Sequence, residues 1–437
     1  MIKLEKGLNE DIIKRISNIK KEPKWMLEFR LKSYEVFKKK TVNFGPKINI
    51  NFDNIIYFKK MSDEVSSDWK KINCKARKIF KNLGLMEAEE KYLGGISTQY
   101  ESEVIYHSML KELYDKNIIF VDTDTALKKY PKLFKKYFNK IVKYDDNKYS
   151  ALNTSVWSGG TFIYIPKNTK LDRPLQSYFR INSKNMGQFE RTIIIVDENS
   201  ELEYIEGCTA PIYSSDSLHA AVVEIYVEKN AKCRYVTIQN WAKNIYNLVT
   251  KRALVKENAT MEWIDGNIGS KTNMKYPCCI LKGDNSKGNC ISIALADKNQ
   301  TQDTGAKMIH LGKNTKSNIV SKSIARNKGT ANYRGLVKIT KNATNSYSSV
   351  KCDTILLDDI SKSDTIPINI NNNKSSIIEH EATVSKISDE NLFYLTSRGI
   401  DEDRAKEMLI IGFIDVFKNE LPMEYAVELN NLMKNKF

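Results

Sequence analysis

The stretch VEKNAKCRYVTIQNW (227–241) decides the fold, because it joins two strand-like runs through a short turn at Asn230. The same phrase, an Asn followed by Ala, Ser or Thr just after a strand-like run, recurs through the middle of the chain. It stands at Asn168, Asn199, Asn230, Asn258, Asn285, Asn314 and Asn342, with a looser eighth copy at Asn373. Neighbouring copies are 27 to 31 residues apart. A fixed period of this length is typical of a solenoid.

An apolar position accompanies the turns. The residues five places after each Asn, from the second copy onward, are Tyr204, Tyr235, Trp263, Cys290, Ile319, Tyr347 and Ile378, whereas the first copy has Arg173. No amphipathic helix fits between the turns, so each repeat is predicted to be a coil of short strands. Asn suits the turn because it tolerates left-handed backbone angles. The chain is therefore predicted to be mainly β, with stacked coils forming a β-helix.

Helical patterns flank this core. Helices are expected over 10–21, with Asn9 as its N-cap, and over 23–40, 62–82, 101–114, 123–141, 390–396, 402–418 and 423–434. A short strand is expected over 118–121, and Pro131 is expected to kink or divide the helix around it. The predicted regions are an N-terminal helical or α+β region (1–150), a β-helix core (151–387) and a C-terminal helical region (388–437). The last region could cap the final coil or dock a partner.

The composition limits the class of protein. The chain has 437 residues, of which 41% are hydrophobic, enough for a sizeable core. Its seven cysteines show no framework spacing, which indicates reduced thiols in a cytosol-like compartment. The net charge of +16 is spread along the chain, so nucleic-acid binding is not expected. No signal segment and no apolar run of roughly 20 residues occur, so membrane insertion is not expected.

Familiar catalytic motifs do not occur in the sequence. It has no Gly-rich nucleotide-binding loop followed by Lys, no HExxH and no GxSxG. No CxxC pair occurs, which excludes zinc ribbons and ferredoxin-type cluster sites. Cys278 and Cys279 alternate in a strand, so only one can face inward, and a structural role is favoured for them.

The repeat brings a second set of residues together near the end of the core. Cys352 on one coil and His380 or Glu381 on the next have roughly the same phase, and neighbouring strands lie about 4.8 Å apart. Thiolate, imidazole and carboxylate together can form a metal or sulfur site. Glu379 and Glu381 are expected to share the face opposite His380. The alternative is a core cysteine beside a solvated acidic turn.

Cys208 has nearly the phase of Cys352 but lies five coils earlier, roughly 24 Å away. The two thiols therefore cannot hold one cluster within a chain, and they could be the two ends of an internal path. Gln239 is expected at the phase of Cys208 one coil on, with Trp241 beside it. Arg180 and Asn182 could contribute polar groups at the entrance.

These residues stand within phrases that resemble the SufB/SufD family of iron–sulfur cluster assembly proteins, and within it the SufB scaffold. The phrases include SYFRIN (177–182), GQFERT (187–192), YIEGCTAP (204–211), QNW (239–241), LVTKRAL (248–254), DTGAKMIHLGKNTKS (303–317), YRGLVKI (333–339), KCD (351–353) and EHEATVSKI (379–387). The resemblance covers nearly the whole chain. It implies a right-handed parallel β-helix with helical ends, agreeing with the repeat.

The resemblance also implies residue roles. Cys208 would accept sulfur, and Arg180, Asn182, Gln239, Trp241 and Lys251 would line its route. Cys352 and Glu381, with His380 near, would build a nascent cluster, either 4Fe–4S or 2Fe–2S. Some relatives carry a Cys-rich insert that residues 57–69 lack here, so a ligand from such an insert is not expected.

The partners implied by the resemblance are the ATPase SufC, docking on the C-terminal helices, and SufD or a second SufB, pairing through the β-helix. SufS and SufE would supply sulfur, and reduced FAD is associated with the family complex as an electron source. The chain itself would be a scaffold and not an enzyme. The alternatives are a structural solenoid without chemistry and a β-helix enzyme acting on polysaccharide. The residue usage favours the plastid stroma of an alga or an apicoplast, with a bacterial cytoplasm as the alternative.

Overall fold

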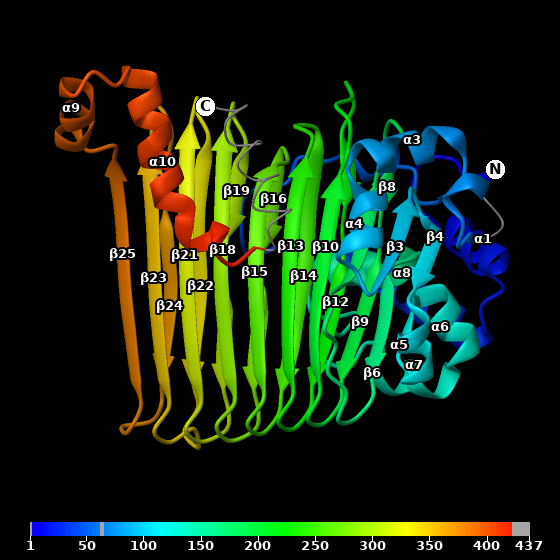
Figure 1. The fold of residues 1–437 in the computed structure, drawn as a ribbon. Helices are drawn as coiled ribbons and strands as arrows, with labels where there is room; N and C mark the ends of the chain where they lie inside the picture. The colour runs from blue at the N-terminus through cyan, green and yellow to red at the C-terminus, as the bar shows by residue number, and fades with distance from the viewer. Residues whose placement is uncertain (1, 62–64, 422–437) are drawn as a thin grey trace.

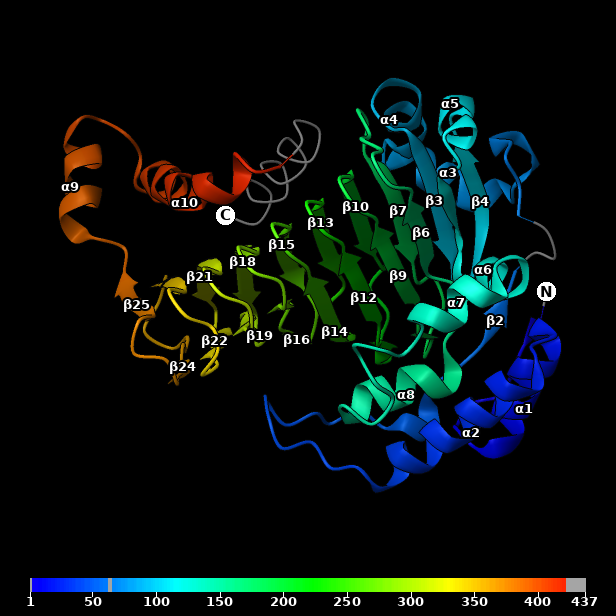
Figure 2. The ribbon, with the colours of Figure 1, turned by 90° about the horizontal axis from the view of Figure 1, so that it is seen from below.

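Two long parallel sheets face each other along the molecule (Figures 1 and 2). The computed structural model describes residues 2–61 and 65–421. The first wall contains β7 (Leu175–Arg180), β10 (Glu201–Thr209), β13 (Lys232–Trp241), β15 (Thr260–Gly269), β18 (Lys287–Asp297), β21 (Lys316–Arg326), β23 (Tyr347–Leu356) and β25 (Ile377–Lys386). The second wall contains β6 (Thr161–Ile165), β9 (Arg191–Val196), β12 (Val222–Val227), β14 (Ile245–Val255), β16 (Thr272–Lys275), β17 (Cys278–Leu281), β19 (Thr301–Thr304), β20 (Lys307–His310), β22 (Thr330–Ile339) and β24 (Thr365–Asn371). In addition, β11 (Ser217–His219) pairs with β14, and β8 (Gly187–Gln188) pairs with β11. The chain alternates between the walls, so each pair of visits forms one coil of a solenoid with about 8 turns.

The asparagine turns predicted from the sequence occur at six of the eight copies. Positive φ angles between 54° and 60° are found at Asn168, Asn199, Asn230, Asn258, Asn285 and Asn314. Side-chain amides of the first five form a ladder, as between Asn230 and Asn199 at 2.9 Å. The copy at Asn342 was placed wrongly, because the left-handed residue is Asn345, with φ 53°. The strand register then puts Ser375, and not Asn373, at the eighth position.

The inward column of the first wall follows from this register. Tyr204, Tyr235, Trp263, Cys290 and Ile319 stack on successive strands and are buried in the core, as predicted. The next two members are Val350 and His380 rather than Tyr347 and Ile378. The seventh position is shifted by three residues, from 347 to 350, and the eighth by two, from 378 to 380.

The N-terminal helices cover the outer face of the second wall (Figure 2). They are α1 (Glu10–Lys20), α2 (Lys24–Lys39) and α8 (Lys148–Val156). The Asn9 side chain caps α1 by accepting from the Ile12 N–H at 2.9 Å, as predicted. Isoleucines of α1 and aromatic residues of α2 are buried with Leu218 and Leu248 of the second wall. This packing anchors the region to the β-helix.

The prediction of a helix over 101–114 was wrong. The chain there forms β4 (Glu103–Met109), antiparallel to β3 (Gly95–Tyr100), and β3 pairs in parallel with β7. Pairing with a preformed wall outweighs the helical spacing of this segment. Around it lie β1 (Ile2–Lys3), β2 (Lys59–Lys60), α3 (Cys74–Asn82), α4 (Leu85–Lys91) and α5 (Lys111–Asp115), with single 3₁₀ turns at Phe52–Asn54 and Trp69–Lys71. The predicted helix over 62–82 is thus confined to α3 and one 3₁₀ turn within the described residues.

Other flanking predictions are confirmed. The short strand is β5 (Ile119–Asp122), and Pro131 separates α6 (Thr123–Lys129) from α7 (Pro131–Tyr137). At the other end lie α9 (Asp389–Ser397) and α10 (Glu402–Lys418), while the helix predicted over 423–434 lies outside the described residues. The predicted fold, a mainly β protein with a right-handed parallel β-helix between N-terminal α/β and C-terminal helical regions, is confirmed.

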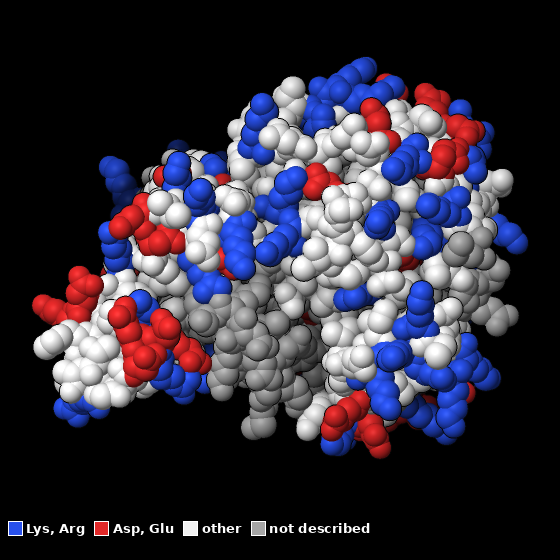
Figure 3. All heavy atoms as spheres, turned by 90° about the horizontal axis from the view of Figure 1, so that it is seen from above, with Lys and Arg blue, Asp and Glu red and all other residues white. Residues whose placement is uncertain are grey.

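The two C-terminal helices differ in what they cover. In α10, Ile410, Ile414 and Phe417 pack on the outer face of the first wall. By contrast, α9 stands beyond the last coil, and its Phe393 is 73% exposed (Figure 2). Within the described part of the chain, no helix has the length and apolarity to span a bilayer. On the face in Figure 3, Lys and Arg are interspersed with Asp and Glu rather than gathered in one patch.

Candidate functional site

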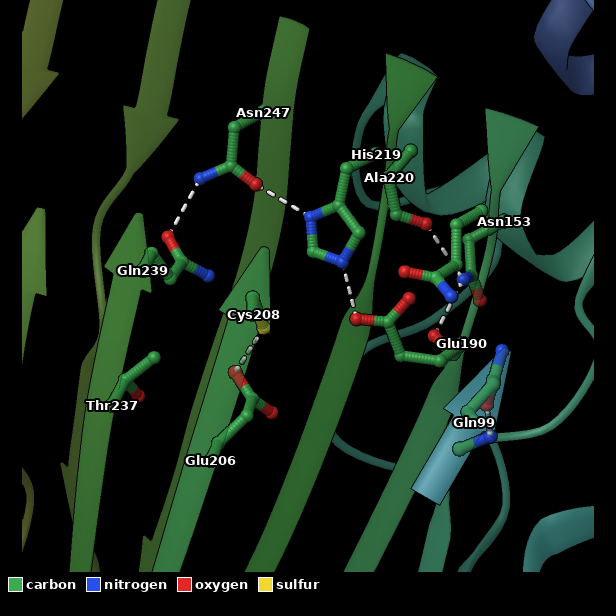
Figure 4. Close-up of polar contacts among 12 residues, drawn as sticks. Gln99, Asn153, Glu190, Glu206, Cys208, His219, Ala220, Thr237, Gln239 and Asn247 are labelled. Atoms are coloured by element: carbon green, nitrogen blue, oxygen red, sulfur yellow. Dashed lines mark hydrogen bonds and ion pairs between the residues drawn. The ribbon is translucent and has the colours of Figure 1, made fainter. Parts of the chain in front are cut away.

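Cys208 lies inside the β-helix, at the inward face of β10. Its neighbours in register are Phe179 on β7 and Gln239 on β13, as the shared phase predicted for Gln239. The thiol is fully buried, and its Sγ lies 3.9 Å from Oε1 of Glu206 (Figure 4). Strand alternation causes this contact, because residues two apart face the same side.

Four charged side chains from the two walls meet beside this thiol. Lys251 from β14 lies 3.6 Å from Glu206 and 3.7 Å from Asp265, and it donates to Thr237 Oγ1 at 2.6 Å. Lys275 from β16 lies 3.1 Å from Asp265. Each of these side chains is buried, and cations from the second wall alternate with carboxylates from the first. The arrangement satisfies charges that would be costly to bury alone.

These charges act on the thiol proton in opposite directions. Burial raises the pKa of Cys208 well above its ordinary value, and the nearby carboxylates of Glu206 and Glu190 raise it further. Lys251 and Lys275 lower that pKa but do not outweigh the other causes. Cys208 is therefore a neutral thiol in the resting chain, and it must lose its proton before it can act as a nucleophile.

A hydrogen-bond chain leads away from the same chamber. The Gln239 carbonyl oxygen accepts from Asn247 Nδ2 at 2.8 Å, and Asn247 Oδ1 lies 2.5 Å from His219 Nδ1. The other nitrogen of His219 contacts Glu190 (Figure 4). Burial alone would lower the pKa of His219, but Glu190 and Asn247 raise it above the ordinary value.

Several polar atoms of this chamber have no hydrogen-bond partner. Among the described residues, these buried atoms include Gln239 Nε2, Glu190 Oε2, Thr192 Oγ1, Trp241 Nε1 and Asp265 Oδ2. Buried polar groups in native proteins are nearly always paired, so a cluster of unpaired ones calls for a functional explanation. This mixture of donors and acceptors fits a small polar guest inside the β-helix.

The predicted entrance residues lie where the strands of the first wall end. Arg180 and Trp241 line a surface pocket together with Thr209, the residue after Cys208, and Arg180 Nη1 donates to Thr209 Oγ1 at 2.7 Å. Trp241 also lies against His219, with ring centroids 4.7 Å apart. Asn182 is anchored beside them through its backbone, since its N–H donates to Glu101 at 3.1 Å.

Cys352 and His380 lie together at the other end, as predicted. Cys352 Sγ is 3.3 Å from His380 Nε2, and the side-chain amide of Asn369 lies 3.2 Å from His380 Nδ1. Burial raises the pKa of Cys352 to about 12, and Asp353 adds to the rise. Burial also lowers the pKa of His380, so at neutral pH the pair is an uncharged thiol beside an uncharged imidazole. The imidazole can accept the thiol proton when an electrophile or a metal approaches the sulfur.

Glu381 lies beside this pair but directs its carboxylate elsewhere. Its backbone carbonyl accepts from the Cys352 thiol at 3.5 Å, whereas its 65% exposed side chain pairs with Lys351 at 3.4 Å. Glu379 bonds Tyr347 on the same outer face, so the predicted alternation about His380 is confirmed. Within residues 2–61 and 65–421, no three His, Cys, Asp or Glu side chains converge on one point. Cys352 and His380 therefore form a pair of donors, short of a full ligand set.

The two thiols lie five strand steps apart, as predicted, but in different columns. Cys352 continues the inward column of Glu206, and not that of Cys208, because the seventh turn is at Asn345. The members of this column are Glu206, Thr237, Asp265, Ser292, Ser321 and Cys352. All are buried, and Ser292 donates to Ser321 at 3.2 Å. A continuous polar column thus joins the Cys208 chamber to Cys352.

Sequence reasoning missed six residues of this site: Glu190, Glu206, His219, Asn247, Asp265 and Lys275. A usable signal existed for two of them. Glu206 stands two residues before Cys208, and Asp265 stands at the same repeat position one strand beyond Thr237. Both positions face inward in a strand, where a carboxylate is unexpected without a role.

Two protein families match this chain in sequence. The SufBD protein N-terminal region matches residues 98–177, and the SufBD core domain of SUF system FeS cluster assembly matches residues 179–413. An iron–sulfur cluster assembly SufBD family protein of Staphylococcus aureus strain MRSA252 is 57% identical over 432 residues, covering 98% of this chain and 93% of the relative. Relatives of the same description from strain USA300 and from Staphylococcus saprophyticus match with the same identity and coverage.

Proposed function

The chain belongs to the SufBD family of iron–sulfur cluster assembly proteins, and we propose that it is a SufB-type scaffold subunit. In this role it receives persulfide sulfur at one end of its β-helix and builds a nascent cluster at the other. The observation that carries the proposal is the buried polar column between the Cys208 chamber and Cys352. A purely structural solenoid has no need of charges in its core.

Cys208 is proposed as the sulfur acceptor. Its thiolate attacks the outer sulfur of a donor persulfide, the donor thiolate leaves, and a persulfide remains on Cys208. The thiol proton passes to the departing donor thiolate, and the Glu206 carboxylate, 3.9 Å from Sγ, favours the protonated thiol until the donor arrives. Arg180, Asn182 and Trp241 would receive the sulfur at the surface pocket where the strands of the first wall end.

Gln239 and Lys251 would line the route inside. Lys251 supplies an ammonium group in the chamber, and an anionic sulfur species would be stabilised beside it. The amide nitrogen of Gln239 has no partner and can donate to the same species. Both side chains are thus suited to a persulfide anion in transit.

Cys352, His380 and Glu381 are proposed to hold the growing cluster, of the 4Fe–4S or 2Fe–2S type, which is cargo and not a resident cofactor. The thiol and imidazole are already together, whereas the Glu381 carboxylate would first have to leave Lys351. The donor pair is incomplete alone, which supports a site shared with a partner. The nearby last coil exposes Ile368 and Ile377, which suits a contact with SufD or a second SufB.

The remaining partners are proposed from the family. SufC would dock on α9 and α10, where Phe393 and Tyr394 are exposed. Because SufC would supply the ATP hydrolysis, this chain itself would not be an enzyme. SufS and SufE would supply sulfur, and reduced FAD would supply electrons. Movement of these helices on ATP hydrolysis would expose Cys352. The plastid stroma stays a prediction, and the staphylococcal relatives favour its alternative, a bacterial cytoplasm.

The decisive experiment is anaerobic. The chain is co-expressed with SufC, SufD, SufS and SufE, the complex is purified, and iron and acid-labile sulfide are measured for wild type, Cys352→Ala and Cys74→Ala. Cys74 is an exposed thiol far from the column, so its variant is the matched control. Iron and sulfide lost only from Cys352→Ala support the proposal. Equal amounts in all three proteins would reject Cys352 as the assembly site, and none in any of them would favour a structural solenoid.

A further inference from the structure

A row of buried polar side chains on the second wall faces the column of the first wall that ends at Cys352. In register along the second wall, Lys275 is followed by Thr304 on β19 and then by Tyr333 on β22. All three side chains are buried. Lys275 bridges to Asp265 on the opposite wall at 3.1 Å, which marks the beginning of a polar seam between the walls. Tyr333 is the member of this row that lies in the last coils.

The Tyr333 hydroxyl is unusual because it has no hydrogen-bond partner among the described residues. Tyr333 is 3% exposed, and its core neighbours include Cys290 and Cys352. The ring meets His380 edge-on, with centroids 6.1 Å apart and planes at 83°. Burial raises the pKa of Tyr333, and the thiols of Cys352 and Cys290 add to the rise. The ring lies near Cys352 because His380, which it meets, has its Nε2 3.3 Å from Cys352 Sγ.

A glycine makes room for this orientation. A Cβ at Gly335 would lie 2.6 Å from the Tyr333 hydroxyl oxygen, so a side chain there would displace the phenol. The ring can therefore lie along its own strand with the hydroxyl held in the interior. A buried phenol normally finds an acceptor, and an orphaned one is costly.

We propose that Tyr333 is a positioning residue of the assembly site, whose hydroxyl donates a hydrogen bond to the sulfur atom carried by Cys352. This inference rests on the proposed function. A persulfide places its outer sulfur about 2.05 Å beyond Sγ, which extends the acceptor into the interior. A phenol donates to an anionic sulfur without giving up its proton, so the bond orients the sulfur and reduces its loss to competing thiols.

The test uses the full chain under anaerobic conditions with sodium polysulfide as the probe. The Cys352 thiolate attacks polysulfide, an S–S bond breaks, and a persulfide forms on Cys352 while the shortened polysulfide leaves. Glutathione is then added, and the Cys352 persulfide is followed by peptide mass spectrometry. In Tyr333→Phe the persulfide should disappear about tenfold faster, the factor that corresponds to 1.4 kcal/mol. Replacing Tyr333 with 4-aminophenylalanine, which keeps a donor at the same place, should restore the wild-type lifetime.

A structural role is separated by thermal unfolding of the untreated proteins. Because the hydroxyl has no partner, Tyr333→Phe should melt at or above the wild-type temperature. Tyr276→Phe is the matched control, since its hydroxyl bonds Asp303 at 2.5 Å, and it should lose stability without changing the persulfide lifetime. An unchanged lifetime in Tyr333→Phe, or a lowered melting temperature, overturns the inference. If the wild-type chain forms persulfide at Cys208 but none at Cys352, the proposed assembly site itself fails, and the role of Tyr333 fails with it.

Discussion

Replacing Glu206 by Gln should make Cys208 a more reactive thiol. The Glu206 carboxylate lies 3.9 Å from Cys208 Sγ and is the first charged group that raises its pKa, after burial. The substitution removes the negative charge and keeps the shape of the side chain. The cations Lys251 and Lys275 remain and then act on the thiolate with one carboxylate fewer to oppose them.

The size of the effect follows from the distance. Two unit charges 3.9 Å apart interact by about 4 kcal/mol at an effective dielectric constant of 20. Since 1.36 kcal/mol moves a pKa by one unit, the upper limit is a fall of about three units. Relaxation of the neighbouring polar groups reduces this limit, so we expect a fall of about one to three units. The thiolate fraction at about pH 8 then rises at least about tenfold.

The assay is alkylation of Cys208 by iodoacetamide, followed by peptide mass spectrometry from about pH 6 to pH 9. Cys208→Ser identifies the labelled peptide, and Glu262→Gln is the matched control, because Glu262 pairs with Arg234 outside the chamber. Glu206→Gln should react faster at every pH, whereas Glu262→Gln should follow the wild type. A rate equal to or below that of the wild type would show that the Glu206 charge does not hold the thiol protonated.

Three further predictions concern the stability of the fold. Burial lowers the pKa of His107 and His310 to about 4, below the unfolded value of 6.5. As the pH falls, the unfolded chain therefore binds protons at these rings before the folded chain does. The free energy of unfolding has its full value above pH 6.5 and falls progressively toward pH 4. At pH 5 it should be smaller by about 2 kcal/mol per ring, which urea unfolding of wild type and His107→Gln will measure. Asn230→Ala puts a residue that tolerates left-handed angles less well than Asn at φ 59° and breaks two ladder bonds, so it should cost about 1–3 kcal/mol in urea unfolding. Asn230→Gly breaks the same bonds without the backbone strain and should cost less; equal losses would contradict the backbone argument. Phe417→Ala empties the contact of α10 with the first wall, so it should cost about 3–5 kcal/mol or release α10, and unchanged hydrogen-exchange protection of α10 would refute this packing.

The fold was predictable because its turns have a chemical signature. Asn supplies the left-handed residue that each coil needs, and the spacing of such residues indicates the coil length. The one misplaced turn lies in KNATNS (341–346), which contains two Asn residues that satisfy the pattern. Only the strand register decides between them, because Asn345 brings aliphatic Val350 inward and leaves Tyr347 outside. The helix predicted over 101–114 failed for a related reason, since β4 pairs with β3, and β3 is held in the first wall by β7, which is far away in sequence.

The site was predictable at its thiols but not in the charges around them. A carboxylate such as Glu206, or an ammonium such as Lys275, is expected at the surface when a single strand is considered. The structure neutralises these groups across the interior, with cations on the second wall and carboxylates on the first. No spacing within one repeat reveals such a pairing, because it depends on which coils face each other.

The cost of these charges is itself an argument about their purpose. Replacing a buried ion-pair cluster by well-packed apolar residues is often neutral or stabilising, so stability alone does not explain Glu206, Lys251, Asp265 and Lys275. Their formal charges cancel, and an additional anion placed among them is stabilised by whichever ammonium it approaches. A neutral sulfur atom would gain little from this arrangement, whereas a persulfide anion would gain wherever it approaches Lys251 or Lys275. These charges are therefore explained better by the proposed passage of a charged sulfur species than by a role in joining the two walls.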